Sequence, residues 1–153
     1  MAVYFIGAGP GGPDLVTVKA KALSGRCPVC LYAGSLVPEA VVACAPKDAI
    51  VRDTAVMTLA DTHAAIVAAY AKGQDVARVH SGDPSLYGAI AEQITLLKRD
   101  GIPFHLIPGV PAYAAAAAAI RQSLVEPAAK VPAGVWLTQD LGALRETPAS
   151  LGP

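Results

Sequence analysis

The chain has 153 residues, with 12 basic and 12 acidic side chains, 54% hydrophobic residues and only 16% charged residues. This length suits one domain with a sizeable core, and this composition excludes intrinsic disorder. A formal net charge of zero provides no broad positive field for nucleic acid, and no run reaches the ~20 strongly apolar residues of a membrane span. We therefore expect a globular protein with neither a nucleic-acid nor a membrane partner.

Five short apolar runs alternate with helical patterns along the chain. The predicted strands are Val3–Ile6, Val29–Tyr32, Ala49–Arg52, Val76–Val79 and Phe104–Ile107. The predicted helices are Leu15–Leu23 with Asp14 as N-cap, Pro38–Ala45, Thr58–Lys72, Ser85–Arg99 and Pro111–Gln122. A further strand is predicted at Gly134–Thr138. This βαβ alternation predicts an α/β fold that is Rossmann-like, with a mostly parallel five-stranded sheet and helices on both faces.

The cysteines Cys27, Cys30 and Cys44 form an odd set. No basic segment precedes the first apolar run, so a secretory signal is not predicted and we expect free thiols in the cytoplasm. Cys27 and Cys30 have the C-x-x-C spacing of a redox pair or of half a zinc site. However, Cys30 falls within an apolar run, and no second pair completes a zinc site. We predict buried structural thiols and no metal site.

Three loops rich in glycine and proline follow the first, fourth and fifth predicted strands, with the sequences GAGPGGPD, HSGDPSLYG and PGVPAY. Glycine and proline also make ordinary tight turns. In open α/β sheets, however, ligands bind beyond the carboxyl ends of the strands. Three such loops at one edge of the sheet favour a binding crevice.

The stretch from Gly7 to Gly12 satisfies the dinucleotide fingerprint G-x-G-x-x-G. That fingerprint requires a helix directly behind the glycines and an acidic residue at the end of the second strand. Pro13 lengthens the loop before the helix, and Ala33 stands where the acid is needed. The residues therefore favour another ligand over a dinucleotide.

Four segments carry a resemblance: VYFIGAGPGGPDLVTVKA, LYAGSLVP, HSGDPSLYGAI and IPGVPAYAAAAAA, in this order from about Met1 to about Ile120. Together they resemble the tetrapyrrole methylase family of S-adenosylmethionine-dependent transferases. YAGSLV followed by SGDPSLYGAI is most similar to the branch that methylates precorrin-4 or cobalt-precorrin-4 at C-11 in cobalamin biosynthesis. Ala33 after Tyr32 differs from the uroporphyrinogen-III branch, in which an aspartate follows the tyrosine.

The resemblance implies a two-domain methyltransferase that binds S-adenosylmethionine between its domains and forms a homodimer when full length. Residues 1–125 would be the first domain, and residues 126–153 a linker or the start of a second domain that this chain lacks. Carried over by motif position, the cofactor contacts are Pro10, Ser81, Gly82, Asp83, Leu86, Pro111 and Ala112. The residues that would face the tetrapyrrole are Gly9, Gly11, Gly12 and Asp14.

Two of these places differ from the family pattern: Gly12 stands where an acid is usual, and Pro111 where many relatives have Ser or Thr. Asp83 either accepts hydrogen bonds from a ligand or caps the helix that begins near Ser85. No catalytic residue is assigned, because the tetrapyrrole ring supplies the nucleophilic carbon and the protein positions the reactants and excludes water. The candidates for a general base are His80, Asp83 and Asp14.

Two alternatives to precorrin-4 methylation stay open from the sequence. One is a binding or interaction domain without catalytic activity, left when the second domain was lost. The other is a tetrapyrrole methylase that acts at a different ring position, such as C-17 or C-20.

Overall fold

The computed structural model describes residues 1–121. The predicted strand Gly134–Thr138, the predicted domain boundary after residue 125 and the predicted linker 126–153 lie outside the described residues.

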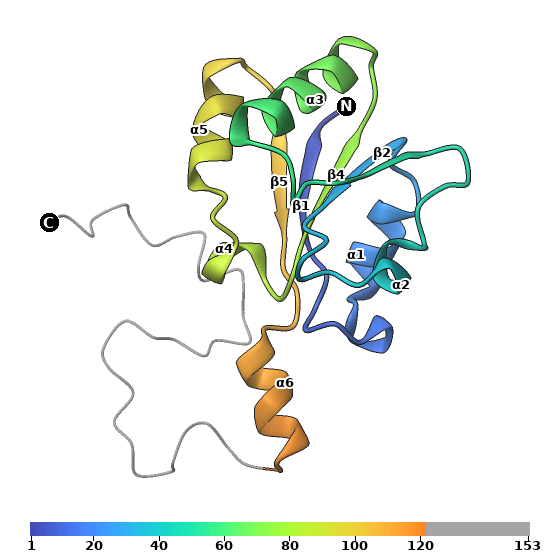
Figure 1. Cartoon of the computed structure of the whole chain (residues 1–153), viewed down its shortest axis with the longest axis vertical. Coiled ribbons are helices and arrows are strands. Elements are labelled where there is room, and N and C mark those ends of the chain that lie inside the picture. Colours follow the sequence, from blue (N-terminus) through green and yellow to red (C-terminus); the bar gives the residue numbers. More distant parts are fainter. Residues whose placement is uncertain (122–153) are drawn as a thin grey trace, which may run out of the picture. The chain divides into compact units, whose positions relative to one another are not determined.

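A five-stranded sheet forms the centre of the described part (Figure 1). Its strands are β1 (Val3–Gly7), β2 (Val29–Tyr32), β3 (Ile50–Asp53), β4 (Val76–His80) and β5 (Phe104–Ile107). They lie in the order β3-β2-β4-β1-β5, and every neighbouring pair is parallel. Val3 is paired with Val76 on one side and with Phe104 on the other. The carboxyl ends of all five strands therefore meet at one edge of the sheet, as the βαβ pattern predicted.

Helices cover both faces of this sheet, which confirms the predicted fold class. The helices are α1 (Val18–Ser24), α2 (Glu39–Val42), α3 (Leu59–Ala71), α4 (Pro84–Tyr87), α5 (Ala91–Arg99) and α6 (Ala112–Ala119), with a short 3-10 turn η1 (Pro13–Leu15). On one face, Leu23 of α1 and Val41 of α2 pack with Val79 of β4. On the opposite face, Ile66 of α3 and Leu97 of α5 pack with other sheet residues. The apolar strands are thus buried from both sides, which suits a parallel sheet.

The start of the first helix differs from the prediction. Asp14 is not its N-cap, because Pro13–Leu15 forms the separate turn η1. The cap is Thr17, whose side-chain oxygen accepts a hydrogen bond of 3.2 Å from the Ala20 backbone N–H. A hydroxyl at this place satisfies a backbone donor that the helix itself leaves unpaired.

The predicted single helix Ser85–Arg99 is also wrong, because the chain forms α4 and α5 with a turn between them. A side chain on Gly88 would collide with the Pro84 carbonyl oxygen. Ala89 has a left-handed backbone with φ of +47°, which an α-helix cannot contain. The apolar periodicity continues across this turn, so the pattern alone gave no sign of it.

The cysteines are free thiols, and Cys27 and Cys30 are buried as predicted, whereas Cys44 is half-buried. Burial raises the pKa of Cys27 to about 11 and that of Cys30 to about 12. Within residues 1–121 no helix has the length and apolar character needed to cross a membrane. The same described range contains no group of His, Cys, Asp and Glu side chains that could hold a metal ion.

Candidate functional site

The loops that follow β1 and β4 are joined by backbone hydrogen bonds. Gly82 N–H donates to the Gly9 carbonyl at 2.7 Å, and Gly9 N–H donates to the Gly82 carbonyl at 3.2 Å. Just before this bridge, Ala8 N–H donates to the His80 carbonyl at 2.8 Å. Gly9 and Gly82 both have positive φ angles, +73° and +61°, which glycine adopts at little cost. The two loops therefore leave the sheet as one connected unit.

The loop after β5 reaches the loop after β4 across the end of β1. β1 lies between β4 and β5 in the sheet, and it ends at Gly7. A Cβ atom on Gly7 would lie 2.5 Å from the Gly109 nitrogen and 2.7 Å from the Gly82 carbonyl oxygen. Three backbones thus meet where no side chain fits, and the absence of a side chain at Gly7 lets the outer two loops approach each other.

Asp83 connects the same two loops through its side chain. Its Oδ1 accepts a hydrogen bond of 2.8 Å from the Ser85 backbone N–H and a short one from the Ser85 hydroxyl. Its Oδ2 accepts a hydrogen bond of 3.0 Å from the Gly109 N–H. Burial raises the pKa of this carboxyl, but the hydrogen bonds from Ser85 and Gly109 outweigh that effect and hold the pKa below its usual value. Asp83 is therefore ionised at neutral pH.

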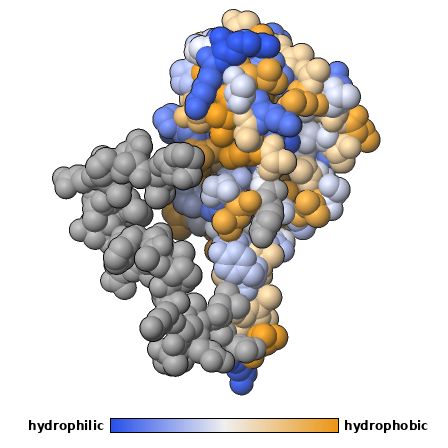
Figure 2. Space-filling model, turned by 90° about the vertical axis from the view of Figure 1, so that its left-hand side faces the viewer, coloured by the Kyte–Doolittle hydropathy of each residue, from blue (hydrophilic) through white to orange (hydrophobic). Residues whose placement is uncertain are grey.

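A hollow of about 350 Å³ opens between these loops, a size within the range of small-molecule sites. One wall comes from the loop after β4 and from α4, and the other comes from the start of α6. Its lining residues are Ser81, Gly82, Asp83, Leu86, Pro111, Ala112 and Tyr113. Figure 2 shows this side of the molecule, and its lower part, which α6 forms, mixes pale blue with pale to full orange and ends in blue.

Two of the apolar side chains that line this hollow are exposed to solvent, where a ligand could contact them. Leu86 is 48% exposed and Tyr113 is 52% exposed. Ala117 is the one buried residue of α6. A hollow lined mostly by apolar side chains together with a few polar groups is typical of a binding site for a small organic molecule.

A model of the tetrapyrrole (corrin/porphyrin) methylases matches residues 2–149. The chain belongs to this family. It is 54% identical over 127 residues to the precorrin-4 C(11)-methyltransferase of Mycobacterium tuberculosis (strain CDC 1551 / Oshkosh), which covers 83% of this chain and 51% of that protein. It is 49% identical over 150 residues to the enzyme of the same name from Sinorhizobium sp, which covers 98% of this chain and 58% of that protein. The chain thus spans about half the length of the curated relatives it matches.

Solved structures of tetrapyrrole methylases show the same fold. A cobalt precorrin-4 methyltransferase matches with a TM-score of 0.80 and 45% identity, over 82% of this chain and 53% of that chain. A uroporphyrin-III C-methyl transferase from Thermus thermophilus, solved in complex with S-adenosylhomocysteine, matches with a TM-score of 0.63 and 33% identity. That second match covers 76% of this chain and 48% of the other. The named members of the family to which this chain belongs are therefore methyltransferases.

Most residues that the resemblance to tetrapyrrole methylases assigned to the cofactor come together in the structure. Six of the seven line the hollow, and Pro10 does not. Pro10 and the four residues assigned to the tetrapyrrole lie on the neighbouring loop after β1, which the Gly9–Gly82 bridge joins to the hollow. Asp14 is exposed within that loop. Tyr113 also lines the hollow, although it was not among the predicted cofactor contacts.

His80 lies outside the hollow, although it precedes Ser81 in the sequence. It is 5% exposed, and its ring centre lies 5.9 Å from that of Phe5. Burial, and after it the charge of Arg78, lowers the pKa of His80 from 6.5 to about 3. The buried Arg78 guanidinium donates to the Gln93 side chain at 3.1 Å and to the Leu31 carbonyl at 3.3 Å. His80 is thus a buried and weakly basic core residue, which makes it the least suited of the three candidates for a general base.

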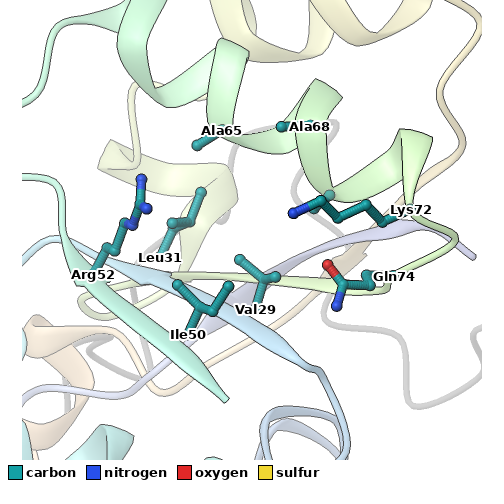
Figure 3. Close-up of a pocket in the computed structure, with 9 residues that line it drawn as sticks. Val29, Leu31, Ile50, Arg52, Ala65, Ala68, Lys72 and Gln74 are labelled. Carbon is teal, nitrogen blue, oxygen red and sulfur yellow. The ribbon is translucent and has the colours of Figure 1, made fainter. Parts of the chain in front are cut away.

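A second hollow lies between α3 and the β2–β3 side of the sheet (Figure 3). Val29, Leu31 and Ile50 form its apolar floor, and alanines of α3 form its roof. Arg52 and Lys72 stand at its rim, as Figure 3 shows. No acidic, histidine or cysteine side chain lines this hollow. The three glycine-bearing loops do not reach it, so the hollow at Gly82 is the candidate site.

Proposed function

We propose that this chain carries the cofactor-binding half of an S-adenosylmethionine-dependent methyltransferase that methylates precorrin-4, or its cobalt form, at C-11. The observation that carries the proposal is the hollow between the motif-bearing loops after β4 and β5, to which the Gly9–Gly82 bridge joins the third motif-bearing loop, the one after β1. Relatives named for this reaction support the substrate, since their identity to this chain reaches 54%. We include a cytoplasmic location and a homodimer of the full-length enzyme in this proposal.

The residues of the hollow fit S-adenosylmethionine. Leu86, Pro111 and Tyr113 supply apolar surface for an adenine ring, while Ser81 supplies a hydroxyl group. A Cβ atom on Gly82 would lie 3.8 Å from the Pro111 Cα and 3.9 Å from the Ala112 nitrogen, in the gap between the two walls. A glycine at this place keeps that gap open for a ligand. We therefore assign Ser81, Gly82, Leu86, Pro111 and Ala112 to cofactor contact.

When bound, S-adenosylmethionine supplies an electrophilic methyl group on a sulfonium. The tetrapyrrole carbon is the nucleophile, so no protein nucleophile is needed, and the chain acts by orientation and by exclusion of water. Leu86 and Tyr113 exclude water from the mouth of the hollow, whereas the loop with Gly9, Gly11, Gly12 and Asp14 faces the tetrapyrrole. Asp83 and Tyr113 are the titratable side chains among the lining residues.

Isothermal titration calorimetry with S-adenosylhomocysteine tests the proposed site. We expect binding by the 153-residue chain and a weaker response from Leu86→Ser, which removes apolar surface from one wall. Val56→Ser is the matched control, because Val56 is 93% exposed and does not line the hollow. Equal affinity of Leu86→Ser and wild type would contradict the site assignment.

Turnover tests the reaction separately. A second candidate function is a domain that binds S-adenosylhomocysteine without methylating precorrin-4. A mass gain of one methyl group on precorrin-4 excludes this candidate, and NMR of the product identifies the methylated carbon. Methylation at C-17 or C-20 would contradict the C-11 proposal.

A further inference from the structure

Both oxygens of the Asp83 carboxylate accept hydrogen bonds from within the protein. Ser85 donates two hydrogen bonds to Oδ1, and Gly109 donates one of 3.0 Å to Oδ2. The bond to Ser85 caps α4, a local role that many N-cap aspartates have. The bond to Gly109 crosses to a loop 26 residues further along the chain. Capping alone does not require this second bond.

The long-range bond joins the two walls of the hollow. Ser81, Gly82 and Leu86 stand on the wall that contains Asp83, and Pro111 and Ala112 stand on the wall that begins two residues after Gly109. The sheet gives no direct pairing between these walls, because β1 separates β4 from β5. At the end of β1, the missing side chain of Gly7 lets the two loops come within hydrogen-bonding distance. The Asp83–Gly109 bond therefore fixes the spacing of the walls.

We propose that Asp83 is a positioning residue, which sets the width of the hollow through Gly109 rather than by contact with the cofactor. This inference rests on the proposed cofactor site, and it replaces the motif-based assignment of Asp83 as a cofactor contact. A carboxylate is suited to the task because it accepts hydrogen bonds at both oxygens and binds each donor more strongly than a neutral acceptor does.

The variant Asp83→Ser separates the two bonds of Asp83. Serine is as good an N-cap as aspartate, so it keeps a hydrogen bond to the Ser85 N–H. Its side chain is too short to reach Gly109 as well. The control is Ser85→Ala, which removes one partner of Oδ1 and leaves the bond from Gly109 to Oδ2 intact. A second variant, Asp83→Asn, retains the length of the side chain but can accept at only one of its two terminal atoms.

Two readouts are taken on the 153-residue chain. Calorimetry with S-adenosylhomocysteine should show an affinity about tenfold weaker for Asp83→Ser and a change of less than about twofold for Ser85→Ala. Residue-resolved amide exchange by NMR, without ligand, should show faster exchange at Gly109 in Asp83→Ser and not in Ser85→Ala. In Asp83→Asn, exchange should rise at either Ser85 or Gly109, whichever N–H loses its acceptor.

The two readouts also separate this inference from the proposed function. If wild type fails to bind S-adenosylhomocysteine, the cofactor proposal is wrong for this chain, and exchange at Gly109 still decides whether Asp83 joins the loops. If wild type binds and Asp83→Ser binds equally well, the positioning role is wrong and the cofactor site stands. Unchanged exchange at Gly109 in Asp83→Ser would likewise overturn the inference.

Discussion

Gly7 at the end of β1 lies against Gly109 with no room for a side chain at either position. The atoms that a Cβ on Gly7 would meet, at 2.5 Å and 2.7 Å, belong to the backbones of Gly109 and Gly82. Backbone atoms held by a sheet cannot move aside as the end of a long side chain can. We expect Gly7→Ala to lower the free energy of unfolding by about 2 kcal/mol or more, measured by urea denaturation.

The comparison variant for Gly7→Ala is Gly25→Ala. A Cβ on Gly25 would meet its nearest atoms at 3.3 Å, and Gly25 has a right-handed backbone. We expect its effect to be below about 1 kcal/mol. Equal losses of stability in the two variants would show that the three-loop contact is not closely packed.

Gly82→Ala tests the left-handed backbone and the ligand gap together. With φ of +61°, alanine at this place should lower the free energy of unfolding by about 1 kcal/mol. The space around it is open, since the nearest atom would lie 3.8 Å away. If the cofactor occupies this gap, the affinity for S-adenosylhomocysteine should also fall about tenfold, or about 1.4 kcal/mol. Thermal melts and calorimetry on the same protein measure the two effects.

Gly101→Ala provides the matched control for this variant. Gly101 has a φ of +67° and no atom within 4 Å of an added Cβ, so it carries the same backbone strain away from the hollow. It should lose similar stability and keep its affinity. If Gly82→Ala keeps its affinity, or if Gly101→Ala loses as much affinity as Gly82→Ala does, Gly82 does not line the cofactor gap.

How far the sequence predicted these contacts depends on their range along the chain. The strands Val29–Tyr32 and Phe104–Ile107 were predicted to the residue, because each is an apolar run bounded by turn residues. The turn at Gly88 was missed, since the apolar periodicity continues unbroken across it. The N-cap of α1 is Thr17 and not the predicted Asp14. The sequence did not distinguish the two, because both residue types are favourable N-caps and they lie close together.

For the site, the loops were predictable and their connections were not. Glycine and proline after Ile6, Val79 and Ile107 indicated three special loops at one edge. The bond from Gly109 to Asp83 joins residues far apart in sequence, and no local pattern encodes it. The sequence left two roles open for His80, a structural residue and a general base, because it is the last residue of β4 and the next residue, Ser81, lines the hollow.

The stability of the protein should depend on pH through His80. The pKa of this group is about 3 in the folded chain and about 6.5 when unfolded. Between these values the unfolded state binds the extra proton, so acid favours unfolding. The free energy of unfolding should therefore fall as the pH drops below about 6.5, by up to about 1.4 kcal/mol per pH unit. Above that pH the contribution of His80 to stability should be fully present.

Urea denaturation at about pH 7, 6 and 5, on either side of the ordinary histidine pKa, measures how the free energy of unfolding changes with pH. His80→Phe keeps an aromatic ring beside Phe5 and removes the titrating group, so its slope should be clearly flatter. A variant that matches the wild-type slope would show that His80 does not take up the proton on unfolding.

The three thiols should differ in reactivity toward an alkylating reagent. Cys27 and Cys30 are 0% exposed, and burial raises the pKa of each to about 11 and about 12. Because the thiolate is the reactive form, both should stay unmodified in the folded chain at about pH 8. Cys44 is half-buried and should react first. Mass spectrometry of iodoacetamide-treated protein identifies the site, and early labelling of Cys30 would contradict the buried core described above.

The position of β1 has a consequence for how the chain acquires its structure during synthesis. β1 is synthesised before its two neighbouring strands, β4 and β5. Val3 can therefore pair only after Val76, and then Phe104, have been synthesised. At a translation rate of about 5–20 residues per second, this delay lasts for several seconds. During that time the apolar first strand has neither of its neighbouring strands to pair with. Contacts so distant in sequence slow folding, and the loop that carries Gly9 can take its shape only after most of the described domain has left the ribosome.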